Sequence, residues 1–158
     1  MKEKIKVLMV CHGNICRSPM AEFLFKDIIT QKGLEDYCEV ASAATSREEL
    51  GNPVHPGTRR KLAELGISTA GKFARQMTKA DYEKYDYLIG MDSMNIRNMM
   101  RILGEDPEGK VYRMLDFGKN PRDIADPWYT GDFEQTYEDV LAGCQGFLNY
   151  LRKQGKLD

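Results

Sequence analysis

The chain of 158 residues is long enough for one domain with a single core, and its 42% hydrophobic and 30% charged residues are typical of a globular protein. A net charge of −1 argues against binding to nucleic acid or to an acidic membrane surface, because no broad basic field is available. No apolar segment approaches the ~20 residues of a membrane span, and the first residues are too quickly structured for a signal peptide. We therefore expect one domain over residues 1–158.

Four cysteines lie along the chain, and their spacing matches neither a disulfide scaffold nor a zinc site. This pattern favours a reducing, cytoplasmic location, which a nucleophilic thiol would need. We expect no metal ion and no cofactor.

The first predicted element is a strand over residues 6–10, a nearly continuous apolar run that suits a buried strand of a parallel sheet. A loop over residues 11–17 follows, and a helix is expected over residues 18–31. Ser18 can cap this helix with its hydroxyl, Pro19 suits the first helical position, and Glu22 falls where a first-turn acid is favoured. Because a strand here turns directly into a helix N-terminus, unpaired N–H groups and the helix dipole predict an anion site.

Both ends of this loop carry chemistry. Cys11 leaves the strand facing the N–H groups, and a thiolate is stabilised by a helix N-terminus and by a nearby cation. Arg17 enters the helix, and its planar set of donors fits the oxygens of a phosphoryl group. Gly13 and Asn14 readily take the left-handed backbone angles that curling the N–H groups inward requires. We expect the phosphate to be bound by His12, Gly13, Asn14, Ile15, Cys16 and Arg17.

The remaining segments predict strands that alternate with helices. Further strands are expected over residues 37–43, 85–90 and 109–115. Helices are expected over residues 57–65, after Thr78, from Asp92 to Gly104, and over residues 133–153. Long loops are expected at residues 45–56, where His55 should be solvated, and at residues 116–132. This alternation indicates an α/β domain with a parallel sheet, in which ligands bind at the carboxyl edge of the strands.

The segment CHGNICRSP, after an apolar strand, resembles the active-site loop of the low molecular weight protein tyrosine phosphatases. Further segments resemble that family in its order: residues 41–46 (ASAATS), 74–76 (ARQ), 86–95 (DYLIGMDSMN) and 125–137 (ADPWYTGDFEQTY). The resemblance covers nearly the whole chain. It implies a four-stranded parallel sheet of order 2-1-3-4 with helices on both faces, and a phosphatase that hydrolyses phosphotyrosine through a phosphocysteine on Cys11.

Such a reaction needs a nucleophile, a charge clamp and an acid for the leaving oxygen. Cys11 and Arg17 fill the first two roles, but the loop contains no carboxylic acid. Asp126 lies in the Asp-Pro-aromatic-aromatic motif where the family has its general acid, and Pro127 keeps it extended. The resemblance also implies a hydrogen-bond network that supports the loop, formed by Ser18, Asn14 and Ser42.

The rim of the site is expected to set the substrate, through His12, Ser46, Arg47, Trp128 and Tyr129. His12 stands where a small or aliphatic residue is more usual in the family, and Arg47 where vertebrate members have an aromatic residue. These departures leave a choice between phosphotyrosine and phosphoarginine open. Lys72 stands where the family often has a histidine that supports the loop, and a charged lysine cannot accept a hydrogen bond.

Two other functions fit parts of this pattern. An arsenate reductase on the same fold would need a further cysteine pair, and residues 82–98 contain no cysteine. A phosphoprotein-binding module without catalysis is disfavoured by the intact Cys11, Arg17 and Asp126. Cys16 is either a small buried residue or the partner of Cys11 in a reversible disulfide. The expected partners are phosphotyrosine proteins or peptides, with phosphate, vanadate or sulfate as active-site anions, and the chain is expected to act as a monomer.

Overall fold

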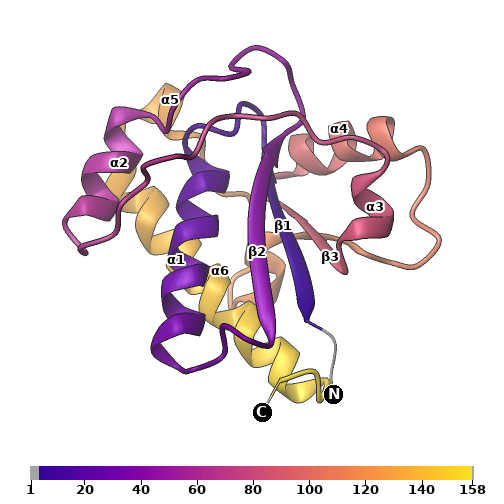
Figure 1. The fold of residues 1–158 in the computed structure, drawn as a ribbon. Coiled ribbons are helices and arrows are strands. Elements are labelled where there is room, and N and C mark those ends of the chain that lie inside the picture. Colours follow the sequence, from indigo (N-terminus) through magenta and orange to yellow (C-terminus); the bar gives the residue numbers. More distant parts are fainter. Residues whose placement is uncertain (1–3, 158) are drawn as a thin grey trace.

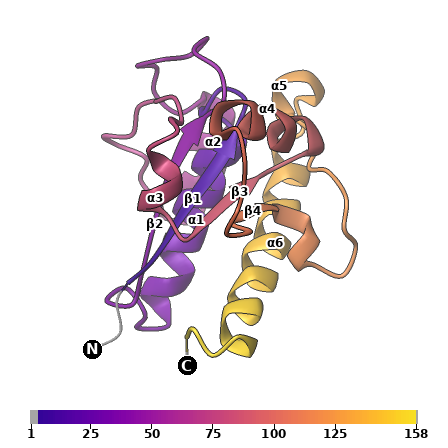
Figure 2. The same ribbon diagram turned by 90° about the vertical axis from the view of Figure 1, so that its right-hand side faces the viewer.

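Strand β1 (Ile5–Cys11) lies inside the sheet and leads directly to the predicted active-site loop. In the computed structural model, which describes residues 4–157, it pairs in parallel with β2 on one side and with β3 on the other. The sheet order is β2-β1-β3-β4, and β4 is also parallel to its neighbour (Figures 1 and 2). The predicted α/β fold with strand order 2-1-3-4 is therefore confirmed. The other strands are β2 (Cys38–Ala44), β3 (Tyr87–Gly90) and β4 (Val111–Arg113).

Helices connect these strands and cover both faces of the sheet (Figures 1 and 2). The elements are α1 (Arg17–Gln31), α2 (Pro56–Ala63), α3 (Asp81–Lys84), α4 (Ser93–Leu103), the 3-10 helix η1 (Met114–Phe117), α5 (Pro127–Thr130) and α6 (Phe133–Lys153). Helices α1 and α6 pack together on one face, and α3 and α4 lie on the other. Within residues 4–157, no helix has both the length and the apolar character needed to cross a membrane.

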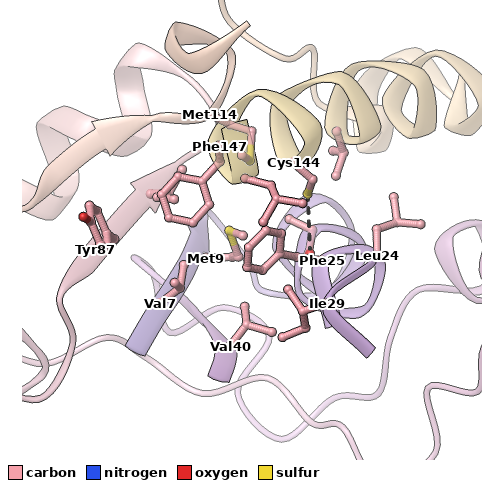
Figure 3. Close-up of a cluster of buried hydrophobic side chains, with 14 of the residues drawn as sticks. Val7, Met9, Leu24, Phe25, Ile29, Val40, Tyr87, Met114, Cys144 and Phe147 are labelled. Carbon is pink, nitrogen blue, oxygen red and sulfur yellow. Dashed lines mark hydrogen bonds between the residues drawn. The ribbon is translucent and has the colours of Figure 1, made fainter. Parts of the chain in front are cut away.

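The alternation of side chains along β1 divides the core between the two faces. Val7 and Met9 point toward α1 and α6, where they meet Phe25 and Phe147, whose ring centroids are 5.4 Å apart (Figure 3). Cys11 belongs to the same cluster, so this face continues to the loop that follows β1. The intervening β1 residues point to the other face, in a cluster that contains Leu8, Val10, Met77, Tyr82, Leu88, Met99 and Leu103. Burial on both faces explains why the β1 sequence is apolar from Val7 onward.

Helix α1 begins one residue earlier than its sequence suggests, and this changes the role of Ser18. The N-cap is Cys16, whose side chain makes no capping hydrogen bond, and Ser18 lies within the first turn. The predictions that Ser18 caps this helix and that Glu22 acts in its first turn are therefore wrong. Both side chains are buried instead, because each belongs to a hydrogen-bond network under the loop.

The predicted loop over residues 116–132 contains more regular structure than expected. Helix η1 follows directly on β4, so the fourth strand is limited to three residues rather than seven. A single helical turn, α5, follows Asp126, whose Oδ1 accepts a hydrogen bond from the Trp128 amide at 3.0 Å. Asp126 and Pro127 are an N-cap and a proline at the start of a helix, a combination that sequence alone could have indicated.

Candidate active site

The segment after β1 curls around the sulfur of Cys11. Asn14 has a φ of 60°, which lies in the left-handed region, and its amide N–H donates to the Cys11 Sγ at 3.3 Å. Ser18 Oγ lies 3.0 Å from the same sulfur. The chain following β2 fixes the outside of the curl, because the Thr45 amide donates to the Cys11 carbonyl oxygen and the Ser46 amide donates to that of His12. One backbone N–H, that of Asn14, and the Ser18 hydroxyl therefore face the Cys11 sulfur.

Asn14 supports this curl through its side chain. Its Nδ2 donates to Ser18 Oγ at 2.8 Å and to Ser42 Oγ at 2.9 Å, while its Oδ1 accepts from the Arg75 amide at 3.2 Å. The Arg75 bond fixes which end of the amide faces the two hydroxyls, since a backbone N–H can only donate. Asn14, Ser18 and Ser42, which the family resemblance implied as a supporting network, are therefore brought together.

An ion pair that the sequence did not reveal sets the direction of these bonds. Ser42 Oγ donates to Glu22 Oε1 at 2.5 Å, and Lys72 Nζ lies 3.6 Å from the same carboxylate oxygen and donates to the Ser42 carbonyl at 2.9 Å. Burial lowers the pKa of Lys72, although Glu22 opposes this effect. Because a carboxylate can only accept, Ser42 must give its hydrogen to Glu22 and accept from Asn14.

The hydrogen of Ser18 is consequently left for another acceptor. Its hydroxyl oxygen accepts from Asn14, and the Cys11 sulfur at 3.0 Å is nearer than the Ala43 carbonyl oxygen at 3.5 Å. Ser18 can therefore donate to a Cys11 thiolate, which stabilises the charged form of the sulfur.

Arg17 is 2% exposed and is held at three points beside the loop. Its Nη1 donates to Asp92 Oδ2 at 2.6 Å and to the Ile124 carbonyl oxygen at 2.8 Å, and its Nη2 lies 3.4 Å from Asp126 Oδ2. Burial opposes the guanidinium charge, but Cys11, Asp92 and Asp126 outweigh it and raise the pKa of Arg17. The cation is therefore fixed in direction before an anion arrives.

The sequence placed Asp92 only at the start of the α4 helix, and it caps this helix, since its Oδ1 accepts from the Asn95 amide at 2.7 Å. Its contact with Arg17 was not predicted. The position of Asp92 just after β3 could have indicated this contact, because the carboxyl ends of neighbouring parallel strands meet at one edge of a sheet.

A pocket of about 100 Å³ opens above the Cys11 sulfur. It is lined by Cys11, His12, Gly13, Ile15, Cys16, Arg17, Glu48, Glu49, Asp126, Trp128 and Tyr129. The aromatic wall is open to solvent, with Trp128 57% and Tyr129 83% exposed. Asn14 lies behind the loop rather than in the pocket wall.

The other side of the rim differs from the sequence prediction. Ser46 and the exposed Arg47 are not among the residues that line the pocket. Two carboxylates take that place, and Glu48 Oε2 lies 2.7 Å from His12 Nε2. Loop residues 45–56 contain no periodic pattern, so the sequence could not indicate which side chain of the Arg-Glu-Glu run turns inward.

Cys16 also lines the pocket. Burial, together with the nearby Cys11 and Asp126, raises the pKa of Cys16 to about 12. Burial likewise raises the pKa of Cys38 and of Cys144 to about 12.

Alkylation by iodoacetamide at pH 8 should therefore modify Cys11 selectively. A thiol with a pKa of about 12 is ionised to only about one part in 10⁴ at this pH, and the thiolate is the reacting form. Peptide mass spectrometry at timed intervals measures the modification of each cysteine, and added phosphate should slow that of Cys11 alone. Equal modification of Cys11 and Cys16 in the folded protein would contradict this prediction.

The geometry thus combines a thiol sulfur, a fixed guanidinium and a carboxyl group around one small pocket. Among the described residues, no three His, Cys, Asp or Glu side chains are grouped to hold a metal ion. The comparison with known proteins agrees with this arrangement: a family model described as low molecular weight phosphotyrosine protein phosphatase matches residues 6–157. The chain belongs to this family.

Relatives of this phosphatase match it along almost the whole chain. The low molecular weight protein-tyrosine-phosphatase YfkJ of Bacillus subtilis is 40% identical over 155 residues, which are 97% of this chain and 99% of YfkJ. PtpA of Staphylococcus epidermidis, a protein of the same description, is 35% identical over 154 residues, which are 97% of each chain. The family resemblance seen in the sequence is therefore confirmed, as is the prediction of a protein-tyrosine-phosphatase.

Solved structures agree with the fold. The crystal structure of YfkJ superposes with a TM-score of 0.93 and covers 96% of this chain and 97% of that chain. The structure of the low molecular weight protein tyrosine phosphatase SP-PTP from Streptococcus pyogenes, 42% identical, superposes with a TM-score of 0.83 and covers 96% and 93% of the two chains.

Proposed function

We propose that this phosphatase hydrolyses phosphotyrosine, as an aryl phosphate monoester, through a phosphocysteine formed on Cys11. One observation carries the proposal: the Cys11 sulfur, the Arg17 guanidinium and the Asp126 carboxyl line the same small pocket. The loop N–H groups and Arg17 provide donors for the phosphoryl oxygens, whose charge grows on the equatorial positions during transfer.

In the first step, the Cys11 thiolate attacks phosphorus as the bond to the phenolic oxygen breaks. Protonated Asp126 gives its proton to that oxygen, so tyrosine leaves as a neutral phenol and the carboxylate remains. The Ser18 hydroxyl donates to the sulfur in the free enzyme, and Arg17 stabilises the transferring group.

In the second step, water attacks the phosphorus of the phosphocysteine. The Asp126 carboxylate accepts a proton from this water as the phosphorus–sulfur bond breaks, which releases inorganic phosphate and restores the Cys11 thiolate. The aspartate thus alternates between acid and base, and both steps balance without any further reactant.

The shape of the pocket favours a flat leaving group. Trp128 and Tyr129 form one wall, where a phenyl ring can stack, and the Cys11 sulfur lies at the base. We infer that phosphotyrosine proteins or peptides are the substrates, that phosphate, vanadate and sulfate occupy the loop as competing anions, and that the chain acts as a monomer in the reducing cytoplasm.

A matched peptide panel tests this proposal. Peptides that differ only in carrying phosphotyrosine, phosphoserine or phosphoarginine are compared by phosphate release, with kcat/KM expected to be highest for phosphotyrosine. Acid quenching during turnover, followed by mass spectrometry, should locate the phosphoryl group on the Cys11 peptide. A preference for phosphoarginine would replace the substrate assignment, whereas a phosphoryl group on another residue would remove the mechanism.

A further inference from the structure

The first turn of α2 is bonded to the outer side of the phosphate-binding loop. The backbone amide of His55 donates to the Ile15 carbonyl oxygen at 2.9 Å, and Thr58 Oγ1 donates to the Cys16 carbonyl oxygen at 3.1 Å. These two bonds hold loop carbonyl oxygens on the side away from the pocket. His55, which was expected to be solvated, therefore lies against the active-site loop.

The imidazole of His55 lies between two aromatic rings. It stacks on Phe133 with ring centroids 5.1 Å apart and an interplanar angle of 21°. On another side it meets the Trp128 ring edge-on, at 5.8 Å and 79°. Phe133 in turn packs on a small cluster that contains Ile15 and Cys16. Within residues 4–157, His55 is the only aromatic ring that packs against Trp128.

The orientation of this imidazole is fixed by a hydrogen bond. The Gly57 amide donates to His55 Nδ1 at 3.0 Å, so Nδ1 acts as an acceptor and the neutral ring carries its hydrogen on Nε2. A side chain at position 57 would meet the Phe133 ring at 2.4 Å, so only glycine allows this close approach. His55 is thus held by its backbone amide, by the hydrogen bond at Nδ1 and by the stacking of its ring on Phe133.

Trp128 links the His55 ring to Asp126. Its backbone amide donates to Asp126 Oδ1 at 3.0 Å while its ring meets His55. Helix α5 is a single turn of four residues, and so short a helix depends on tertiary contacts for its position. Since Trp128 is more than half exposed, the contact with His55 is one of few that can hold its side chain.

We propose that His55 is a positioning residue, which holds Trp128 and thereby sets Asp126 at the correct place over the phosphate-binding loop. The inference rests on the proposed role of Asp126 as the proton donor. His55 does not touch the substrate or exchange a proton with it. Loss of its ring should move the carboxyl group relative to the leaving oxygen, and small displacements of a reacting group are costly in rate.

Two substitutions separate the effect of the His55 ring from the effect of its hydrogen bond to the Gly57 amide. His55→Asn keeps a side-chain acceptor for the Gly57 amide and removes the ring, because asparagine is a good N-cap residue. His55→Phe keeps an aromatic ring against Trp128 and removes the acceptor. The comparison uses kcat/KM for phenyl phosphate, whose leaving group needs a proton, and for dinitrophenyl phosphate, whose leaving group does not.

For His55→Asn, we expect kcat/KM to fall by about tenfold with phenyl phosphate and by less than about twofold with dinitrophenyl phosphate. His55→Phe should retain most of the activity with both esters. In an Asp126→Asn background, His55→Asn should cause no additional leaving-group-dependent loss, because the group that it positions is already absent. Equal losses with both esters, or a larger effect of His55→Phe, would overturn the proposal.

A spectroscopic readout is independent of turnover. Trp128 is the single tryptophan of the chain, so protein fluorescence reports its surroundings directly. Acrylamide should quench this fluorescence more strongly in His55→Asn than in the wild type, and His55→Phe should resemble the wild type. Unchanged quenching in folded His55→Asn would show that the ring does not hold Trp128, and would overturn the inference even if activity fell.

The controls distinguish this inference from the proposed function. If Asp126→Asn itself shows no leaving-group dependence, the role of Asp126 is wrong and the positioning proposal falls with it. If Asp126→Asn shows that dependence and His55→Asn does not, only the positioning proposal fails.

Discussion

Replacement of Cys11 by serine is expected to reduce the turnover of an aryl phosphate by about 10⁴-fold or more, because the reaction loses its nucleophile. Phosphate binding should largely survive. The anion is held by the loop N–H groups and by Arg17, whose position is set by Asp92 and Ile124 rather than by the sulfur. Isothermal titration with phosphate or vanadate measures binding, and release of p-nitrophenol from its phosphate ester measures turnover.

Cys38→Ala is the matched control for this substitution. Cys38 is also a buried thiol, but it lies at the start of β2, at the opposite end of the strand from the residue that pairs with Cys11. It should retain turnover even if it lowers stability. Full turnover by folded Cys11→Ser would remove Cys11 as the nucleophile, and loss of phosphate binding would indicate that the curl itself depends on the sulfur.

The local parts of this site could be predicted from the sequence. The apolar strand, the curl at Gly13-Asn14 and the helix that follows are encoded within about 20 consecutive residues, so local rules were enough to place Cys11 and Arg17 together. The sheet order and the role of Asp126 came from the family resemblance, since no local rule brings a residue more than 100 positions away to the same pocket.

Other parts could not be predicted because they depend on tertiary packing. Glu22 reads as an ordinary first-turn acid, and only the packing of α1 against β2 brings it to Ser42, where it also meets Lys72. The lysine at position 72, which cannot accept a hydrogen bond, fits as a donor to the Ser42 carbonyl oxygen. His55 was expected to be solvated because prolines flank it, but its loop folds back onto the phosphate-binding loop and onto Trp128.

Replacement of Asp126 by asparagine should lower kcat/KM in proportion to the need of the leaving group for a proton. We expect a fall of about 10²- to 10³-fold with phenyl phosphate, within the range of general acid catalysis, and of less than about tenfold with dinitrophenyl phosphate. The amide keeps an oxygen that can accept from the Trp128 amide, so α5 retains its cap. Asp126→Ala lacks this acceptor and should in addition lose about 1 kcal/mol of stability.

Asp123→Asn is the control for charge and for loop position. Asp123 lies three residues earlier and is bonded to Ser93 and Arg113, and it is not among the residues that line the pocket. Its replacement should change kcat/KM by the same small factor for both esters. If Asp126→Asn behaved in this way too, the carboxyl group would act only through its contact with Arg17, and the proton would have to come from another group.

The second step provides an independent check on Asp126. With dinitrophenyl phosphate, the first step no longer needs an acid, but hydrolysis of the phosphocysteine still needs a base. Asp126→Asn should therefore release dinitrophenol in a rapid burst of about one equivalent per active site, followed by slow turnover. If Asp126 serves both steps, its replacement should give a burst with dinitrophenyl phosphate and a slow first step with phenyl phosphate. If Asp126 only supports Arg17 electrostatically, this pair of results is not expected. The two esters together therefore separate acid–base catalysis from electrostatic support of Arg17.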